Sequence, residues 1–184
     1  MLRLQDIPDH SFSNHRPSQM DRDEFVAIFG NVFEHSAWIA MQIWHTGLML
    51  RDDTAAGLCS AFIDVVEAAG REPQLALLRA HPDLAGRLTR RSDVTDASRN
   101  EQASAGLNDC SDDEFEEFQD LNRRYTKKFN FPFILAVRSR HRTEILEAFR
   151  RRVDNDVEDE FREALQQVYQ IARCVNIKAK FREG

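Results

Sequence analysis

The stretch LLRAHPDLAGRL, residues 77–88, decides how the chain is divided into helices. Apolar residues at helical spacing precede it, and the same spacing resumes after it. Between them stands His81-Pro82. A proline disfavours the α conformation in the residue before it, and its ring fits the first turn of a new helix. We therefore predict that one helix ends at about Ala80 and that another begins at Pro82, with His81 at the joint.

Helical periodicity extends on both sides of this joint. Apolar residues recur at helical spacing in several further stretches, including Phe25, Ile28, Phe29, Val32 and Phe33; Leu58, Phe62, Val65 and Val66; Ile145, Leu146 and Phe149; Phe161, Leu165, Val168 and Ile171. Gly47 and Gly70 are expected to end two helices, and SDDE (111–114) has the capping-box pattern that begins one.

The run FNFPFILAV interrupts this periodicity. Its proline and its apolar, β-branched residues predict a short, buried, extended segment near residues 131–137. We expect an all-α fold: a single compact domain of about seven to eight helices over residues 21–184. Residues 1–20 are expected to form a loosely ordered N-terminal arm.

Composition restricts the function. The chain has 184 residues and a formal charge of −6, which argues against a general nucleic-acid binder. The longest apolar run is too short to cross a bilayer, and no secretory signal is recognisable, so we expect no membrane association. Cys59, Cys110 and Cys174 are isolated, which favours a reducing compartment, and we expect the protein to be cytoplasmic.

No metal or cofactor motif is present. The six histidines show no H-E-x-x-H spacing, the cysteines form no C-x-x-C pair, and there is neither a G-x-S-x-G motif nor a glycine-rich phosphate loop. We therefore predict that the protein binds no metal and uses no cofactor.

Three polar residues are candidates for chemistry, each with a structural alternative. His81 is either a junction residue bonded to local backbone or a proton carrier, because the imidazole pKa lies near neutrality. Ser98 and Glu101 form the capping box SRNE, which by itself explains both. Alternatively, this helix N-terminus faces a cavity and, with Gln102, binds an anionic ligand.

Four motifs in order resemble the family of 2-oxo-4-hydroxy-4-carboxy-5-ureidoimidazoline (OHCU) decarboxylases, which act in the breakdown of urate to allantoin. The motifs are HPDLAGRL (81–88), SRNEQASAGL (98–107), FNFPFILAVRSRHRTEIL (129–146) and EFREALQQVYQIA (160–172). The similarity extends from about Phe25 to Ile171. Each motif is weak by itself, but four at matching separations are specific.

The resemblance implies an all-helical, commonly homodimeric enzyme that acts on a small ureidoimidazoline without a cofactor. It implies that His81 is the acid/base residue and that Glu101 lies near the catalytic centre. The substrate contacts that it implies are Pro82, Ser98, Gln102, Arg173 and the backbone of Phe133, Ile134, Leu135, Ala136 and Val137.

The C-terminal stretch departs from the family pattern. The family's tail carries two arginines of which the second approaches the substrate, whereas here Arg173 is followed by Val175 at that second position. Arg173, Lys178 or Arg140 is then left to supply the positive charge.

Two other functions fit the same residues. One is a non-catalytic helical protein-interaction domain in which His81 and Glu101 serve only as caps. The other is a related enzyme that hydrolyses a ureide or purine ring. Convergence of the candidate residues on a cavity would distinguish an enzyme from an interaction domain.

Overall fold

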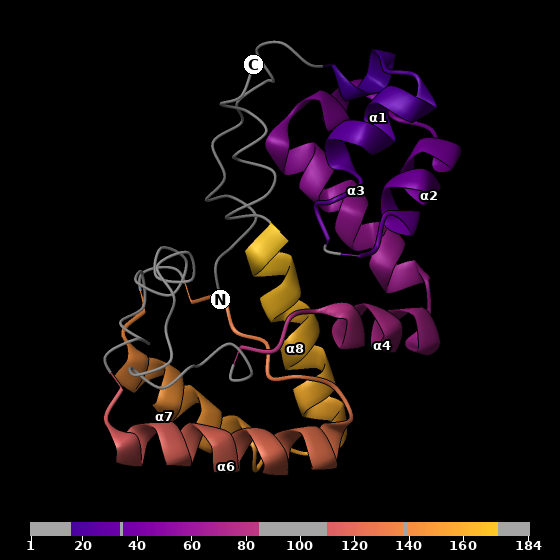
Figure 1. Ribbon diagram of the computed structural model, residues 1–184. Helices are drawn as coiled ribbons and strands as arrows, with labels where there is room; N and C mark the ends of the chain where they lie inside the picture. Colours follow the sequence, from indigo (N-terminus) through magenta and orange to yellow (C-terminus); the bar gives the residue numbers. More distant parts are fainter. Residues whose placement is uncertain (1–15, 34, 85–109, 138–139, 173–184) are drawn as a thin grey trace. The chain divides into compact units, whose positions relative to one another are not determined.

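The structure is a computed structural model that describes residues 16–33, 35–84, 110–137 and 140–172 (Figure 1). These residues contain seven α-helices and two short 3₁₀ helices, and no β-strand is found among them. The all-α prediction is therefore confirmed. The chain divides into two compact units, residues 1–80 with 169–184, and residues 81–168.

The first unit holds the N-terminal helices. They are η2 (Pro17–Gln19), α1 (Arg22–Phe29), α2 (Trp38–Thr46), η3 (Leu50–Asp53), α3 (Ala55–Ala68) and α4 (Arg71–Ala80). Asp21 caps α1 by accepting a 2.9 Å hydrogen bond from the N–H of Glu24. As predicted, Gly47 ends α2, with a positive φ of 95° that favours glycine. Gly70 follows the end of α3, with a φ of 82°.

The core of the first unit is apolar and rich in phenylalanine. Phe25 and Phe29 are fully buried on α1, and the ring of Phe33 lies 5.6 Å from that of Phe62 on α3. The predicted stripe of α1 is longer than the helix, because the helix ends at Phe29 with Gly30 as its cap. Residues of the following turn, Phe33 among them, complete the stripe from outside the helix.

Part of the predicted arm is also described. Residues 16–20 include η2, where Pro17 is buried. The N–H and the hydroxyl of Ser18 each donate a 2.8 Å hydrogen bond to the carboxylate of Asp53. This short piece is thereby tied to η3, while residues 1–15 lie outside the described part.

The second unit contains α6 (Asp112–Phe129), α7 (Arg142–Arg152) and α8 (Val157–Ile171), the last turn of α8 being counted with the first unit. The predicted capping box begins α6: the N–H of Glu114 donates to the hydroxyl of Ser111 at 3.2 Å, and the N–H of Ser111 donates to Glu114 at 2.9 Å. The second bond lowers the pKa of Glu114. Asn130, in the left-handed conformation with a φ of 62°, ends the helix.

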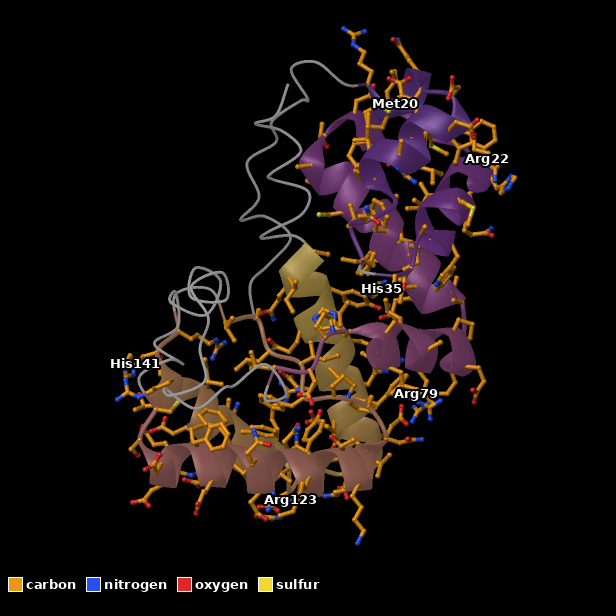
Figure 2. The ribbon with its side chains drawn as sticks, viewed as in Figure 1. Met20, Arg22, His35, Arg79, Arg123 and His141 are labelled. Carbon is orange, nitrogen blue, oxygen red and sulfur yellow. The ribbon has the colours of Figure 1, made fainter. Side chains whose placement is uncertain are left out.

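Two ion pairs join α7 to α6. Arg150 donates two hydrogen bonds of 2.6 Å to the carboxylate of Glu117, and Arg142 donates one of 3.2 Å to Glu114. Other charges of α6 face solvent. Arg123 points away from the core of this unit (Figure 2) and pairs with Asp120 on its own helix at 3.0 Å.

An aromatic cluster fills the space inside the second unit. Tyr125 of α6 is at its centre, with ring centroids 4.6–5.9 Å from those of four phenylalanines, Phe129, Phe131, Phe133 and Phe149. Phe133 also stacks on Phe149 at 3.8 Å, with the rings nearly parallel. Because two of these rings belong to the segment 131–137, this cluster fixes where that segment lies.

Candidate active site

The joint at His81 has the predicted position. The helix α4 ends at Ala80, and His81 follows in a bend with its side chain half-buried. The prediction that a new helix begins at Pro82 is wrong, because Pro82 and Asp83 adopt no helical conformation. Asp83 instead accepts a 2.9 Å hydrogen bond from the side-chain amide of Asn122, which holds this stretch against α6.

The segment 131–137 is non-helical, as predicted, and it is held from several sides. Its residues Phe133, Ile134 and Leu135 are buried, and Ala136 and Val137 are half-buried. Gln167 of α8 accepts a 3.0 Å hydrogen bond from the N–H of Ala136. Arg140 folds back on the segment, donating from Nε to the carbonyl of Ala136 at 3.1 Å and from its N–H to the carbonyl of Val137 at 2.9 Å.

One face of α6 brings the joint and this segment together. Asn122 holds Asp83, and Tyr125 contacts the ring of Phe133 at 5.3 Å. Residues three apart on a helix lie on the same face, with Cβ atoms about 5–6 Å apart. The stretch that carries His81 and the segment 133–137 therefore lie over adjacent turns of α6.

A buried ion pair lies behind the segment. Arg152, the last residue of α7, donates to Oε1 of Glu160 from Nη2 at 2.6 Å and from Nε at 2.9 Å. Arg152 is 1% exposed and Glu160 is 0% exposed. Arg152 also donates from Nη1 to the carbonyl of Ile134 at 2.7 Å. The pair is thus bonded directly to the backbone of the candidate substrate-binding segment.

Arg152, Glu160 and Gln167, which hold the segment from behind, are not among the site residues that the sequence predicts. Their signal is a charged or polar residue on the inward stripe of an amphipathic helix. Arg152 follows Ile145 and Phe149 at helical spacing, and Glu160 precedes Ala164 and Gln167 in the same way. Opposite charges on the inward stripes of two consecutive helices predict a buried pair, but not what else the pair contacts.

The other predicted site residues lie outside the described part of the chain. Ser98, Glu101 and Gln102 belong to residues 85–109, and Arg173 and Lys178 to residues 173–184. The structure therefore leaves their positions untested. Arg140 is described, and it contacts the segment as given above.

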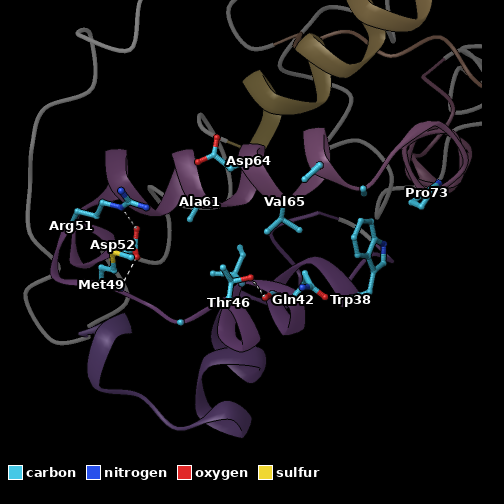
Figure 3. A pocket seen from close by; sticks show the side chains of 14 residues that line it. Trp38, Gln42, Thr46, Met49, Arg51, Asp52, Ala61, Asp64, Val65 and Pro73 are labelled. Atoms are coloured by element: carbon cyan, nitrogen blue, oxygen red, sulfur yellow. Dashed lines mark hydrogen bonds and ion pairs between the residues drawn. The ribbon is translucent and has the colours of Figure 1, made fainter.

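A separate pocket is found in the first unit, with a volume of about 570 Å³ (Figure 3). Residues of α2, η3 and α3 line it, Trp38, Gln42, Asp52 and Val65 among them. Asp52 is only 3% exposed and accepts a 2.7 Å hydrogen bond from the N–H of Met49. Among the predicted site residues that the structure describes, His81, Pro82 and residues 133–137, none lines this pocket, so we do not assign the candidate active site to it.

Two further kinds of site are absent from the residues that the structure describes. No three His, Cys, Asp or Glu side chains among them are grouped so that they could hold a metal ion. None of the helices in the same residues has both the length and the apolarity needed to cross a membrane.

Comparison with known proteins gives consistent matches over most of the chain. The family model of OHCU decarboxylase matches residues 18–174. A 2-oxo-4-hydroxy-4-carboxy-5-ureidoimidazoline decarboxylase of Haloferax volcanii is 42% identical over 163 residues, which is 89% of this chain and 93% of that protein. The protein of the same name from Mus musculus is 36% identical over 155 residues, 84% of this chain and 85% of that protein.

Solved structures agree with this result. A crystal structure of (S)-allantoin synthase superimposes with a TM-score of 0.67 at 30% identity and covers 89% of this chain, which spans 52% of that chain. A structure of OHCU decarboxylase with (S)-allantoin gives a TM-score of 0.60 over 87% of this chain and 98% of that one; at 21% identity it supports the fold alone. The family model and the sequence relatives together show that this chain belongs to the OHCU decarboxylase family.

Proposed function

We propose that this protein decarboxylates OHCU to (S)-allantoin in urate degradation, with His81 as the acid/base residue. Family membership and the names of the relatives support this reaction. The structural observation that carries the proposal is the position of the His81 joint and the segment 133–137 over adjacent turns of α6. A proton carrier and a backbone that can bind amide groups are thereby close to each other.

The reaction suits a protein that supplies only binding and a proton. The carbon that bears the carboxylate lies beside a C=N bond of the substrate ring. As CO₂ leaves, the electron pair of the broken C–C bond moves into that C=N unit, so the substrate is its own electron sink. The protein must hold the carboxylate out of the ring plane, stabilise the developing charge and deliver one proton to one face.

His81 is proposed to move that proton. It takes the proton of the neighbouring hydroxyl or protonates the product carbon, and a donor fixed on one face gives the S product. Its position after α4 supports this role, because the side chain is half-buried at a bend rather than packed along the helix. Glu101 is proposed to set the imidazole tautomer or to bind the ureido N–H groups.

The substrate is proposed to bind through Pro82, Ser98, Gln102 and the backbone of residues 133–137. The exposed fractions along that segment support this assignment, because burial decreases from Phe133 to Val137 and leaves the later residues accessible. Arg173 is proposed to bind the substrate carboxylate.

The oligomeric state, the location and the domain organisation are also part of the proposal. The family resemblance supports a homodimer, and the isolated cysteines support a cytoplasmic location. Residues 21–184 are proposed to form one enzyme domain, which follows the arm 1–20. Sedimentation velocity tests the dimer.

A coupled circular-dichroism assay tests the activity. OHCU is generated from urate with a urate oxidase and a hydroxyisourate hydrolase, and the protein is then added. We expect rapid appearance of the (S)-allantoin signal and a loss of about 10²–10⁴-fold in rate for His81→Ala, the usual contribution of a general acid or base. His45→Ala, an exposed histidine in the last turn of α2, is the matched control and should retain the wild-type rate.

Two results would contradict the proposal. Racemic allantoin formed no faster than without the protein would exclude the decarboxylase and favour an interaction domain. Wild-type rates in a folded His81→Ala variant would leave the activity in place and remove His81 as the proton carrier.

A further inference from the structure

Each guanidinium nitrogen of Arg152 and each carboxylate oxygen of Glu160 takes part in at least one hydrogen bond. Besides Arg152, the carboxylate of Glu160 accepts a hydrogen bond from the hydroxyl of Tyr125 and one of 2.8 Å from the side-chain amide of Asn155. Burial raises the pKa of Tyr125 above its ordinary value, so its hydroxyl remains a neutral donor. The carboxylate of Glu160 is therefore held by three elements, which are α6, α7 and the turn before α8.

Stability alone is a weak explanation for such a pair. Removing two charges from water costs several kcal/mol for each ion, and well-packed apolar residues often replace a buried pair without loss. The third guanidinium nitrogen of Arg152, which does not bond Glu160, indicates another role. Nη1 bonds the carbonyl of Ile134 at 2.7 Å, and the guanidinium lies 4.7 Å from the ring centroid of Phe133. Arg152 therefore contacts two consecutive residues of the segment, Phe133 and Ile134.

A hydrogen bond that holds the C=O or the N–H of a peptide unit also sets the direction of the other group of that unit. In a trans peptide the C=O of one residue and the N–H of the next point in opposite directions. Because Arg152 holds the carbonyl of Ile134, the N–H of Leu135 points away from it. Gln167 accepts a hydrogen bond from the N–H of Ala136. The carbonyl of Leu135 belongs to the same peptide unit and therefore points away from Gln167.

The third peptide unit repeats this arrangement. Arg140 holds the carbonyl of Ala136 at 3.1 Å, so the N–H of Val137 points away from Arg140. Within the described residues, the N–H and carbonyl of Leu135 and the N–H of Val137 have no hydrogen-bond partner. They form a donor–acceptor–donor series that complements a cyclic amide or urea edge, with its alternating C=O and N–H groups.

We propose that Arg152, held by Glu160, is a positioning residue for substrate binding, and that Gln167 is a second one. Neither touches the substrate. They hold the inner side of the segment so that the backbone groups of Leu135 and Val137 are aligned toward a ureide ligand before it binds. This inference rests on the proposed function, and it adds the residues that orient the binding backbone.

The lysine variant Arg152→Lys separates positioning from charge pairing. Lysine keeps the positive charge beside Glu160, but a single ammonium cannot reproduce the planar fork that reaches both Glu160 and Ile134. We expect a folded protein whose KM for OHCU rises about tenfold, the cost of a misplaced hydrogen bond, with a smaller change in kcat. The binding constant of (S)-allantoin, measured by calorimetry, should weaken by a similar factor.

Gln167→Met tests the second residue and decides the question if Arg152→Lys does not fold. Methionine has similar length and cannot replace the amide acceptor, so KM is again expected to rise. The matched control is Arg150→Met, because Arg150 lies on the same helix as Arg152 but pairs with the partly exposed Glu117. This control should leave KM unchanged.

Amide NMR shifts provide a readout that a purely structural role would not change. In the wild-type protein, (S)-allantoin should shift the N–H signals of Leu135 and Val137, and in folded Arg152→Lys these shifts should shrink. Unchanged KM and unchanged shifts in both folded variants would overturn the positioning role while the wild-type activity stands. A wild-type protein that neither turns over OHCU nor binds (S)-allantoin would instead overturn the proposed function.

Discussion

Asn122 donates a 2.9 Å hydrogen bond to the carboxylate of Asp83, a residue 39 positions away and two residues after His81. The oxygen of the same amide, Oδ1, is buried and has no hydrogen-bond partner within the described residues. The bond fixes the loop that follows α4 to the middle of α6. Its consequence for catalysis is that α6, and not α4 alone, sets the position of the proposed proton carrier.

Replacing Asn122 by alanine should therefore lower activity more than stability. A displacement of about 1 Å in a reacting group can cost about a hundredfold in rate, so we expect kcat/KM to fall by about ten- to a hundredfold in Asn122→Ala. The coupled assay measures this loss, and thermal unfolding checks the fold.

A double-mutant cycle with Asp83→Ala isolates the bond. If the two side chains act through each other, adding Asn122→Ala to Asp83→Ala should cost little further activity. Fully additive losses would show that Asn122 acts by some other route.

The cap of α6 should contribute to stability and not to catalysis. Ser111→Ala removes the hydroxyl that accepts the N–H of Glu114, and loss of such a cap costs about 1 kcal/mol in the free energy of unfolding. Urea denaturation measures the loss. Ser111→Thr keeps the acceptor and is the control, which should remain near wild type; equal losses in both variants would contradict the capping role.

Two glycines should differ in how they tolerate a methyl group. At Gly57 in α3, an ideal Cβ would lie 1.8 Å from the backbone carbonyl oxygen of Arg51, and backbone cannot move aside easily. At Gly47 a Cβ meets nothing within 4 Å, so alanine costs only the strain of a positive φ, about 1–3 kcal/mol. Urea unfolding should show Gly57→Ala to be the less stable variant, and the reverse order would contradict the close approach.

The pair of Glu117 and Arg150 predicts a pH dependence of stability. The hydrogen bond from Arg150 lowers the pKa of Glu117 below its ordinary value. A lowered pKa in the folded state means that the stabilisation is present above the unfolded pKa, about 4.3, and is lost as pH falls through the lowered value. Glu117→Gln should thus be less stable than wild type near neutrality, and the difference should shrink in acid.

Chemical denaturation at about pH 6 and at successively lower pH values measures how this difference shrinks. The effect should also decrease in high salt, because Glu117 and Arg150 are 37% and 53% exposed. A stability difference that stays constant with pH would show that the carboxylate charge does not contribute.

Local features of the sequence predicted much of the fold. The end of α4 at Ala80, the end of α2 before Gly47 and the capping box at Ser111 all appear in the structure at the predicted residues. Each depends on interactions within a few residues, a proline ring, a positive φ or a side chain that bonds a nearby N–H. Such interactions can be inferred from neighbours in the sequence.

The candidate site could be predicted only in part. The sequence predicts His81 and residues 133–137 as separate motifs, whereas their position over adjacent turns of α6 is a result of tertiary packing. The prediction of a helix that begins at Pro82 is wrong, and tertiary packing again accompanies the difference. A bond between Asp83 and Asn122, far apart in the sequence, accompanies a non-helical path that local preferences do not predict.

Local patterns in the sequence are enough to predict the helical class, several of the helix ends and a histidine at a joint, because periodicity, caps and prolines act between near neighbours. The meeting of Arg152 and Glu160 at the carbonyl of Ile134, by contrast, depends on tertiary packing. The groups that meet there come from α6, α7, α8, the turn before α8 and the segment between α6 and α7. The distances between side chains on different helices depend on how the whole core packs.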